Sequence, residues 1–408
     1  MTLPDTTIGG GVVTRFRPGF SHLVAAVLRR FLKPAQYGTL TVRLPSRLLV
    51  THSGPRPGPQ ALLIVRRWRT LARMALGGSL GLARAYMDND CRSPDIGAVL
   101  EFGLRNEEFL LKETGAPRSM RIVERLRHFA RANTRRGSRR NIAAHYDLGN
   151  RFYALWLDRG MNYSSALFTD EGQTLEAAQE CKLARAAELL GVRPGQRVLE
   201  IGCGWGPLAE RLVTAHGARV TGLTLSTEQL AFAKARLHRQ AAADLHLKDY
   251  RDVAERYDRI VSIEMIEAVG ERYWPVYFSK LRNCLTDAGI AVLQAITIAE
   301  SRFADYRRRP DFIQRYIFPG GMLPTREIIR REAERAGLRL VDGQSFASSY
   351  ARTLAEWRRR FLAAWPQIQT LGFDARFKRM WEYYLSYCEA GFRCGAIDVS
   401  LLKFVPAT

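Results

Sequence analysis

The sequence predicts an α/β protein in which a doubly wound, mostly parallel sheet accompanies a smaller N-terminal α+β domain. From residue 145 onward, apolar strand-like segments alternate with helical stretches, the pattern of a parallel sheet with helices on both faces. The first of these strands, residues 197–202, runs into Gly202, Gly204 and Gly206 and then into an amphipathic helical stretch. A turn of this kind favours a nucleotide or nucleoside, because glycine lets the backbone approach a ligand closely.

The composition is that of a globular protein with a large excess of positive charge. The 408 residues are 47% hydrophobic and 25% charged, which allows a large core and fits two domains. Lys and Arg number 62 against 40 Asp and Glu, so the net charge is +22. Such a charge concentrates anions, and nucleic acid and an anionic membrane surface are weighed here against a simply solvated basic surface.

The cysteines and the apolar segments indicate a reduced protein that does not span a membrane. The six cysteines lack the spacing of a disulfide framework or a zinc site, so we expect free thiols and no metal. The apolar run at residues 290–299 has only the length of a strand, well short of the ~18 residues of a spanning helix. The N-terminus lacks the charged and apolar regions of a signal peptide, and we expect a cytoplasmic location.

The N-terminal part divides into a tail and a small domain. Residues 1–19 are rich in Gly, Thr and Pro and are expected to be flexible. Residues 20–116 begin with an amphipathic helix at 21–33 and continue with strand-like alternation and mixed segments. We expect a small α+β domain here that docks on lipid or mediates a homodimer.

A strongly basic segment follows at residues 117–141. It contains nine arginines and one acidic residue, and its first part has the periodicity of a helix with an apolar side. A basic helix of this kind is suited to an anionic lipid surface, although an interdomain linker with solvated arginines explains the same pattern.

Residues 142–408 form the predicted catalytic domain. Because ligands bind beyond the carboxyl ends of parallel strands, we expect the positions near 202, 224, 250, 263 and 294 to share one rim. The strands are predicted at residues 197–202, 219–226, 245–250, 257–265 and 289–298.

The spacing of the glycines narrows the choice of ligand class. A dinucleotide site favours G-x-G-x-x-G, whereas here Gly206 is followed by Pro207. The pattern of Glu200 followed by three alternating glycines resembles the first motif of Rossmann-like S-adenosylmethionine (SAM) methyltransferases of class I.

Seven blocks of the sequence carry a more specific resemblance. In order they are HYDLGNRFYALWLDRGMNYSSALF (145–168), VLEIGCGWG (198–206), TGLTLSTEQ (221–229), DYRD (249–252), SIEMIEAVGERYWPVYF (262–278), YIFPGGMLPT (316–325) and SSYARTLAEWRRRFLAAWP (348–366). These blocks are similar to those of the cyclopropane-fatty-acyl-phospholipid synthase family, which includes the mycolic acid cyclopropane synthases, and the similarity runs from about residue 140 to 405.

The resemblance implies a SAM site. At the end of the second strand, neutral Thr224 and Ser226, with Gln229 one turn later, stand where many methyltransferases present an acid to the ribose hydroxyls. The residues that the resemblance places around SAM are Tyr163, Ser164, Glu200, Gly202, Cys203, Gly204, Gly206, Thr224, Gln229, Tyr250 and Arg251.

The implied reaction makes two demands on the protein. A carbon–carbon double bond attacks the sulfonium methyl group and becomes a carbocation, so the site needs aromatic faces in a dry groove and a base that removes a proton. Residues 273–318 and 346–384 are rich in aromatic side chains, most of which are expected in the core and the rest along an acyl channel. They include Tyr273, Trp274, Tyr277, Phe278, Tyr306, Phe312, Tyr316 and Phe318.

In the family the base is thought to be a bound bicarbonate. The resemblance places the residues that hold it at Ser165, Glu267, Gln294, Ile296 (through its backbone) and Tyr350. Ser165 and Gln294 depart from the family, which commonly has Cys and His there, but both can still donate hydrogen bonds to an anion. Position alone does not separate Glu267 from Glu264, three residues earlier, and only the resemblance assigns the role to Glu267.

Three functions of different classes remain open. The first is a peripheral enzyme on the inner membrane face that forms a cyclopropane on an unsaturated phospholipid acyl chain, or alternatively a methyl-branched or exomethylene product. A SAM-dependent RNA methyltransferase is disfavoured, because the basic segment carries only Phe129 for base stacking. We therefore expect no nucleic-acid partner. A non-catalytic lipid-binding homologue is disfavoured by the glycine turn and by Thr224 and Gln229, which indicate a SAM site.

Overall fold

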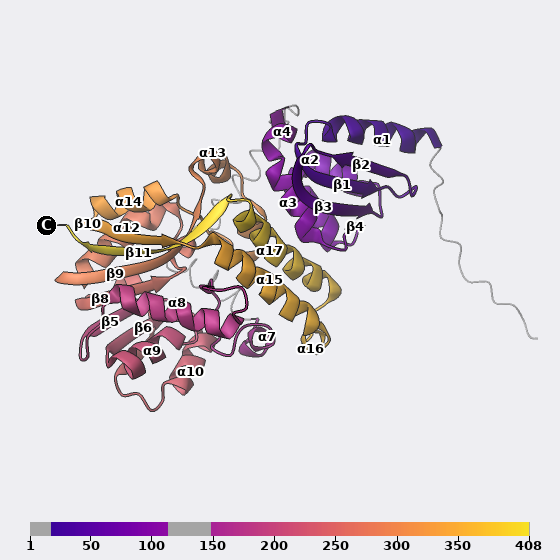
Figure 1. Cartoon of the computed structure of the whole chain (residues 1–408). Helices are drawn as coiled ribbons and strands as arrows, with labels where there is room; N and C mark the ends of the chain where they lie inside the picture. Colours follow the sequence, from indigo (N-terminus) through magenta and orange to yellow (C-terminus); the bar gives the residue numbers. More distant parts are fainter. Residues whose placement is uncertain (1–17, 113–147, 408) are drawn as a thin grey trace, which may run out of the picture.

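The computed structural model describes residues 18–112 and 148–407, which form an N-terminal unit and a larger unit that corresponds to the predicted catalytic domain and is called the catalytic unit (Figure 1). The tail at residues 1–17 and the basic segment predicted at 117–141 lie outside the described residues. Within the described ranges, no helix has the length and apolar character needed to cross a membrane.

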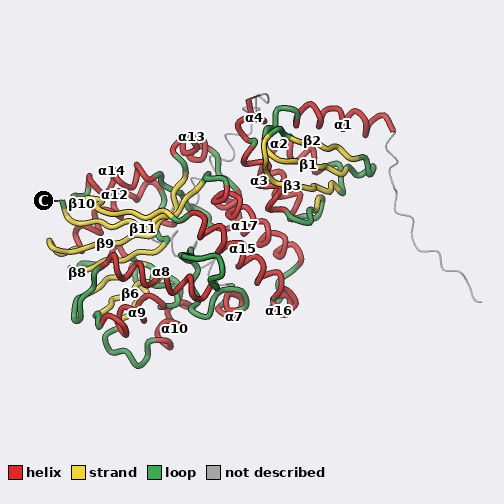
Figure 2. Tube along the Cα trace, in the orientation of Figure 1, coloured by secondary structure: helices red, strands yellow, loops and turns green. Residues whose placement is uncertain are grey.

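The N-terminal unit packs helices on a four-stranded mixed sheet of order β2-β1-β3-β4. Strands β1 and β3 are parallel, whereas β2 and β4 are antiparallel to their neighbours. Helix α1 lies at the outer edge of the unit (Figure 2). The elements are α1 (Pro18–Leu32), β1 (Tyr37–Arg43), β2 (Leu49–Ser53), β3 (Arg56–Val65), α2 (Arg69–Met87), β4 (Cys91–Arg92), α3 (Ile96–Arg105) and α4 (Glu107–Lys112).

Helix α1 has two apolar faces. Ala25 and Leu32 are buried against the unit, as the amphipathic pattern of the sequence predicts. Phe20, Leu23, Val27 and Phe31 follow a second helical stripe that faces solvent, with Leu23 64% and Val27 60% exposed. Packing within the unit therefore leaves part of the apolar surface of α1 uncovered.

The catalytic unit contains the predicted doubly wound sheet, which is confirmed. Its order is β10-β11-β9-β8-β5-β6-β7, and the five strands from β5 to β9 are parallel. The order reverses at β5, which pairs with β6 on one side and β8 on the other, so a crevice opens beyond its carboxyl end. The elements up to β9 are α7 (Asn150–Ala154), α8 (Leu175–Leu190), β5 (Arg197–Ile201), α9 (Pro207–His216), β6 (Arg219–Thr224), α10 (Thr227–Arg236), β7 (Ala243–Leu247), the 3₁₀ turn Tyr250–Asp252, β8 (Tyr257–Ile263), α11 (Ile266–Val269), the 3₁₀ turn Glu271–Tyr273, α12 (Trp274–Cys284) and β9 (Leu285–Ile298).

Helices cover both faces of this sheet. In β5, Val198 belongs to the hydrophobic cluster under α8 and α9, whereas Leu199 and Ile201 belong to the cluster under α12. Figure 1 shows α12 and α14 on one side of the strands and α8, α9 and α10 on the other. Burial on both faces explains why these strands are continuous apolar runs in the sequence.

Two antiparallel strands, absent from the sequence prediction, extend the sheet. Strand β11 inserts between β9 and β10 and runs antiparallel to both. The elements after β9 are α13 (Glu300–Arg308), the π-helical turn Ile313–Ile317, α14 (Arg326–Arg335), β10 (Leu338–Ser345), α15 (Ala347–Ala363), α16 (Trp365–Thr370), α17 (Ala375–Arg393) and β11 (Ile397–Pro406).

Helix α17 connects the two units. It packs against α15 of the catalytic unit and against α2 and α3 of the N-terminal unit. The hydroxyl of Tyr86 donates to Glu382 at 3.0 Å, and Arg379 donates to the carbonyl of Met87 at 2.8 Å. The N-terminal unit is thereby bonded directly to a helix of the catalytic core.

Candidate cofactor and catalytic site

The turn after β5 has a backbone that only glycine adopts freely. Gly202, Gly204 and Gly206 all have positive φ angles, of 84°, 53° and 86°. A Cβ on Gly202 would lie 2.5 Å from the Cγ of Met265, so a side chain there would collide with its neighbour. The glycines at these positions are thus explained by the shape of the turn itself.

A cavity opens at this turn, at the carboxyl ends of the parallel strands. It is lined by nine of the eleven residues that the resemblance places around SAM: Tyr163, Ser164, Glu200, Gly202, Cys203, Gly204, Thr224, Gln229 and Tyr250. The structure therefore brings together residues from the ends of three strands, β5, β6 and β7, and from the loop before α8.

The two other predicted cofactor residues lie outside the lining. Gly206 precedes α9, and a Cβ there would come within 3.1 Å of the Cβ of Ala233 on α10, so this glycine serves helix packing. The guanidinium of Arg251 donates two hydrogen bonds to Asp249, at 2.9 and 2.6 Å, and lies against the rings of Tyr250 and Tyr273. Arg251 therefore contacts Tyr250 of the cavity wall without lining the cavity itself.

The end of β6 presents neutral hydrogen-bonding groups. The hydroxyl of Thr224 donates to Oε1 of Gln229 at 2.9 Å, and both residues are buried in the cavity wall. Ser226 caps α10 by accepting from the backbone N–H of Gln229. The cap fixes the first turn of α10 and so holds the Gln229 side chain beside Thr224.

A buried lysine, which sequence reasoning missed, lines the same cavity. The Nζ atom of Lys182 on α8 donates to Oδ1 of Asn162 at 3.2 Å and to Oγ of Ser164 at 3.0 Å. Burial lowers the pKa of Lys182 to about 8 and raises the pKa of Glu200 to about 8. The signal in the sequence was a lysine on the apolar face of a helix, in line with Leu175, Ala178 and Ala186.

The donors predicted around the site base converge on Glu264. Its Oε1 accepts from the backbone N–H of Ser165 and from Nε2 of Gln294, both at 2.8 Å. Its Oε2 accepts from the hydroxyl of Tyr350 at 2.6 Å. Glu264 itself lines the cofactor cavity, at the end of β8.

Glu267 is placed differently from the other members of the predicted set. Its Oε1 accepts from the backbone N–H of Ile296, and its Oε2 has no hydrogen-bond partner among the described residues. Burial and the neighbouring Glu264 raise the pKa of Glu267 to about 8. At neutral pH this carboxyl is therefore mostly protonated and is not a ready proton acceptor.

The residues present do not fit a bound bicarbonate. The N–H of Ser165, the amide of Gln294 and the hydroxyl of Tyr350, which would hold the anion, already donate to the side chain of Glu264. The hydroxyl of Ser165 points elsewhere and donates to the carbonyl of Ala166. A second carboxylate-like anion at these donors would meet the negative charge of Glu264.

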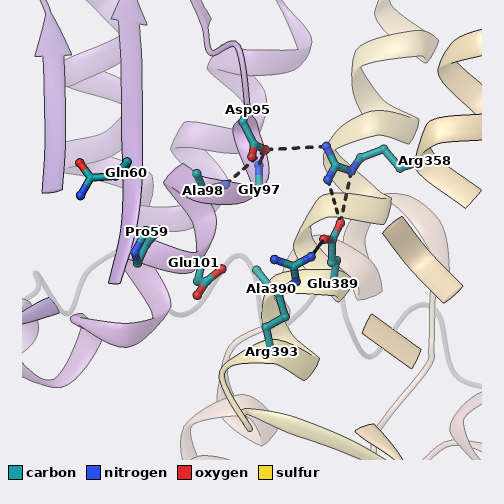
Figure 3. A pocket seen from close by; sticks show the side chains of 10 residues that line it. All are labelled: Pro59, Gln60, Asp95, Gly97, Ala98, Glu101, Arg358, Glu389, Ala390 and Arg393. Atoms are coloured by element: carbon teal, nitrogen blue, oxygen red, sulfur yellow. Dashed lines mark hydrogen bonds and ion pairs between the residues drawn. The ribbon is translucent and has the colours of Figure 1, made fainter. Parts of the chain in front are cut away.

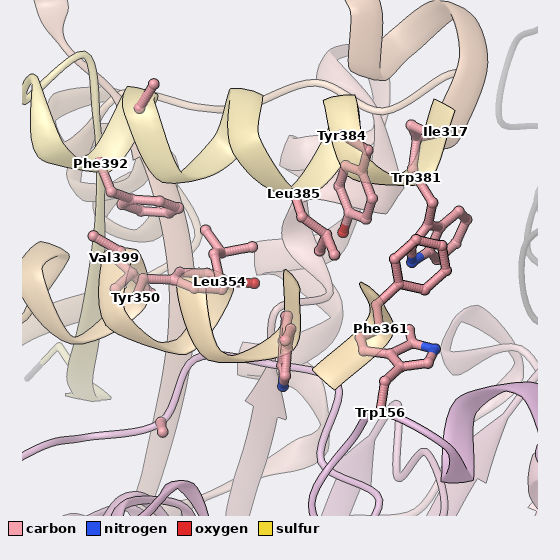
Figure 4. Close-up of a cluster of buried hydrophobic side chains, with 14 of the residues drawn as sticks. Trp156, Ile317, Tyr350, Leu354, Phe361, Trp381, Tyr384, Leu385, Phe392 and Val399 are labelled. Atoms are coloured by element: carbon pink, nitrogen blue, oxygen red, sulfur yellow. The ribbon is translucent and has the colours of Figure 1, made fainter. Parts of the chain in front are cut away.

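Aromatic rings gather between α15 and α17 (Figure 4), and one of them, Tyr350, is the donor to Glu264. Tyr350 stacks on Phe392, with ring centroids 4.4 Å apart, and Tyr163 and Tyr384 share a hydrogen bond of 2.9 Å between their hydroxyls. Of the aromatics predicted from 273 to 318, Trp274, Tyr277, Phe278 and Phe312 are buried, and Tyr273, Tyr306, Tyr316 and Phe318 are partly buried. Tyr350, the ring bonded to Glu264, comes from the second of the two predicted aromatic segments, residues 346–384.

A second cavity lies between the two units and is lined mainly by charged and small residues (Figure 3). Arg358 on α15 pairs with Glu389 on α17 at 3.0 Å and with Asp95, the N-cap of α3, at 3.7 Å. These ion pairs join the units and account for the polar lining, so the cofactor cavity remains the candidate site.

Comparisons with known proteins agree with this geometry. A family model described as mycolic acid cyclopropane synthetase matches residues 133–402. The chain is 40% identical over 397 residues to tuberculostearic acid methyltransferase of Mycobacterium tuberculosis, covering 92% of this chain and 90% of that protein. It is 38% identical over 339 residues to cyclopropane-fatty-acyl-phospholipid synthase of Escherichia coli, covering 82% and 84%. A solved mycolic acid cyclopropane synthase in complex with SAH and CTAB matches with a TM-score of 0.62 and 32% identity, over 65% of this chain and 97% of that one. The strand order, the glycine turn and these matches together show that the chain belongs to the mycolic acid cyclopropane synthetase family.

Proposed function

We propose that this protein transfers a methyl group from SAM to the double bond of an unsaturated acyl chain of a membrane phospholipid. One observation carries the proposal: a single cavity is lined both by the glycine turn after β5 and by Glu264, the carboxylate held by Tyr350. A nucleoside site and a proton acceptor are then within reach of the same substrate.

Several residues of the cavity are suited to hold SAM. The hydrogen-bonded pair of Thr224 and Gln229 offers polar groups to ribose hydroxyls, and the glycine turn leaves room for the ligand beside the backbone. Lys182 and Glu200 bring groups suited to the carboxylate and the amine of the amino-acid part. When bound, SAM supplies an electrophilic methyl group.

The aromatic cluster is suited to the other half of the reaction. The rings of Tyr163, Tyr350 and Trp357 pack against one another as part of a closely packed wall. Such a wall excludes water and stabilises a carbocation by cation–π attraction. Loss of a proton from the new methyl group would then close a cyclopropane ring.

A second product is supported by a specific observation. The relative that matches 92% of this chain is named a tuberculostearic acid methyltransferase, whereas a cyclopropane synthase matches 82%. Gln294 also cannot carry a proton as a histidine can. A methyl-branched or exomethylene chain is therefore the second candidate product.

The experiment is to incubate the purified protein with SAM and vesicles of a cis-monounsaturated phospholipid and to analyse the recovered fatty acids by mass spectrometry with fragmentation. We expect a gain of one CH₂ at the former double bond. A ring supports cyclopropanation, and an exomethylene group supports the second product. An unchanged fatty acid, from protein shown to bind SAM, would overturn the proposed function.

The membrane source of the substrate is supported by α1. Its exposed stripe of Phe20, Leu23, Val27 and Phe31 is accompanied by Arg29 and Arg30 in the last turn, and the helix has no acidic residue. Apolar side chains beside basic ones favour adsorption to an anionic lipid surface. We accordingly propose peripheral binding at the inner membrane face, with a cytoplasmic catalytic unit.

A further inference from the structure

We propose that Glu264 is itself the proton acceptor of the reaction and that the protein works without a bound bicarbonate. This inference rests on the proposed function, since it assigns the base for the cation formed there. It also differs from the role that the sequence resemblance gives to Glu267.

The hydrogen bonds define a built site for one carboxylate. Three donors from three separate segments reach it: Ser165 from the loop before α8, Gln294 from β9 and Tyr350 from α15. Both oxygens are engaged, so the carboxylate has a fixed position and orientation. Burial raises the pKa of this carboxyl, and each of the three donors opposes that rise by stabilising the charged form.

The backbone at Glu264 supports a specific role for its side chain. The residue has a φ angle of 50°, which is uncommon for any residue with a Cβ. Its N–H donates to the carbonyl of Gln294 at 2.8 Å, so the strand end is fixed against β9. Glycine would adopt this conformation without strain, whereas the strained backbone of a glutamate lowers the folding stability by on the order of 1 kcal/mol.

The surroundings distinguish Glu264 from the other acids of the site. Lys182, the buried lysine of α8, lies on the cavity side, and its charge acts with the three donors against the rise that burial causes in the pKa of Glu264. Glu267 faces away toward the backbone of Ile296 and shares none of the three donors. Of the two glutamates, only Glu264 is both fixed by donors and exposed to the cavity.

The proposed step balances without any further reactant. A C–H bond of the transferred methyl group breaks, its electron pair forms the bond to the cationic carbon, and the proton moves to an oxygen of Glu264. If a hydride shift comes first, the same electron pair forms a carbon–carbon double bond instead. The carboxylic acid then returns the proton to solvent before the next turnover.

The test begins with the unmodified protein. We measure the rate of CH₂ addition to a cis-monounsaturated phospholipid, with buffers purged of carbon dioxide and with added bicarbonate. The same rate is expected in both, within twofold. A rate that depends on bicarbonate would overturn the inference while leaving the proposed function intact, and no CH₂ addition in either buffer would overturn the proposed function itself.

Two substitutions complete the test. Glu264→Gln should lower the rate by about 100-fold or more, because a general base contributes about that much, while the SAM dissociation constant stays within threefold. Glu264→Gly removes the carboxylate, frees the three donors and suits the backbone, so its low rate should rise when bicarbonate is added.

The inference would be contradicted if Glu264→Gln kept more than a tenth of the unmodified rate. It would also be contradicted if added bicarbonate did not change the rate of Glu264→Gly. Glu334→Gln on the exposed side of α14 is the matched control and should retain full activity. Thermal unfolding of each variant shows that a lost rate is not a lost fold.

Discussion

At the scale of single residues, the donors around the base could be predicted, but the group they hold could not. Ser165, Gln294 and Tyr350 meet as the resemblance implies, although they bond to Glu264. Two glutamates three residues apart at the end of one strand look alike in a sequence. What separates them is their surroundings, since Glu264 lines the cavity and holds the three donors whereas Glu267 bonds to the backbone of Ile296, and no sequence pattern shows this.

The raised pKa of Glu267 leads to a prediction about stability. This carboxyl titrates near 8 in the folded protein and near 4.3 in an unfolded chain. Below about pH 4 it is protonated in both states and has no effect. Between these pH values ionisation favours the unfolded chain, so the free energy of unfolding falls as the pH rises, and the loss is complete above pH 8.

Glu267→Gln should remove this loss, because glutamine resembles the protonated acid. We expect the unfolding free energy of the variant, minus that of the unmodified protein, to increase from pH 5 to pH 8 in urea titrations. Glu334→Gln serves as the surface control. Parallel stability curves for Glu267→Gln and the unmodified protein would contradict a buried, protonated Glu267.

At the scale of elements, the parallel part of the sheet was predictable because each strand is buried on both faces. The predicted segments at 197–202, 219–226 and 257–265 correspond to β5, β6 and β8 within two residues at either end. Strand β10 escaped prediction because it is an edge strand whose residues are mostly exposed, so it lacks a continuous apolar run. Strand β11 was missed because it follows a long helix near the end of the chain and pairs antiparallel, outside the alternating pattern.

The packing of helix α17 predicts a large loss of stability when one of its buried rings is removed. Trp381 is almost fully buried and its ring packs against Phe152, Trp156, Phe377 and Tyr384. Trp381→Ala should lower the free energy of unfolding by about 3–5 kcal/mol, because the lost ring leaves a cavity. Gln369→Ala, at an exposed position of α16, should change it by less than about 0.5 kcal/mol. Denaturant titrations of both variants provide the measurement, and a loss below 1 kcal/mol for Trp381→Ala would contradict this packing.

At the scale of the whole molecule, the net charge of +22 indicated an anionic partner but not its place of contact. The structure adds the exposed apolar stripe of α1. From the amphipathic sequence pattern alone, these apolar side chains would be expected inside the domain. The N-terminal unit that carries α1 is bonded to α17, and α17 contributes Tyr384 to the wall of rings at the site. The surface proposed to touch lipid and the site proposed to act on lipid thus belong to one packed assembly.

The lipid contact is tested with the double variant Leu23→Ser and Val27→Ser. We expect weaker co-flotation with phosphatidylglycerol vesicles, a slower reaction on vesicles and unchanged SAM binding, since both side chains are exposed. Binding of the unmodified protein should also weaken as salt rises, because salt screens the charges. Leu247→Ser, on the far strand β7, is the matched control. Equal flotation of all three proteins would rule out α1 as the docking helix.

The left-handed backbone at Glu264 has a consequence for how such enzymes diversify. A glutamate codon becomes a glycine codon by one base change, and at this position the main chain would accept glycine without moving. A lineage could therefore pass between an enzyme that carries its own base and one that recruits a dissolved anion in a single mutational step. The dependence of a relative on carbon dioxide could then be read from one codon.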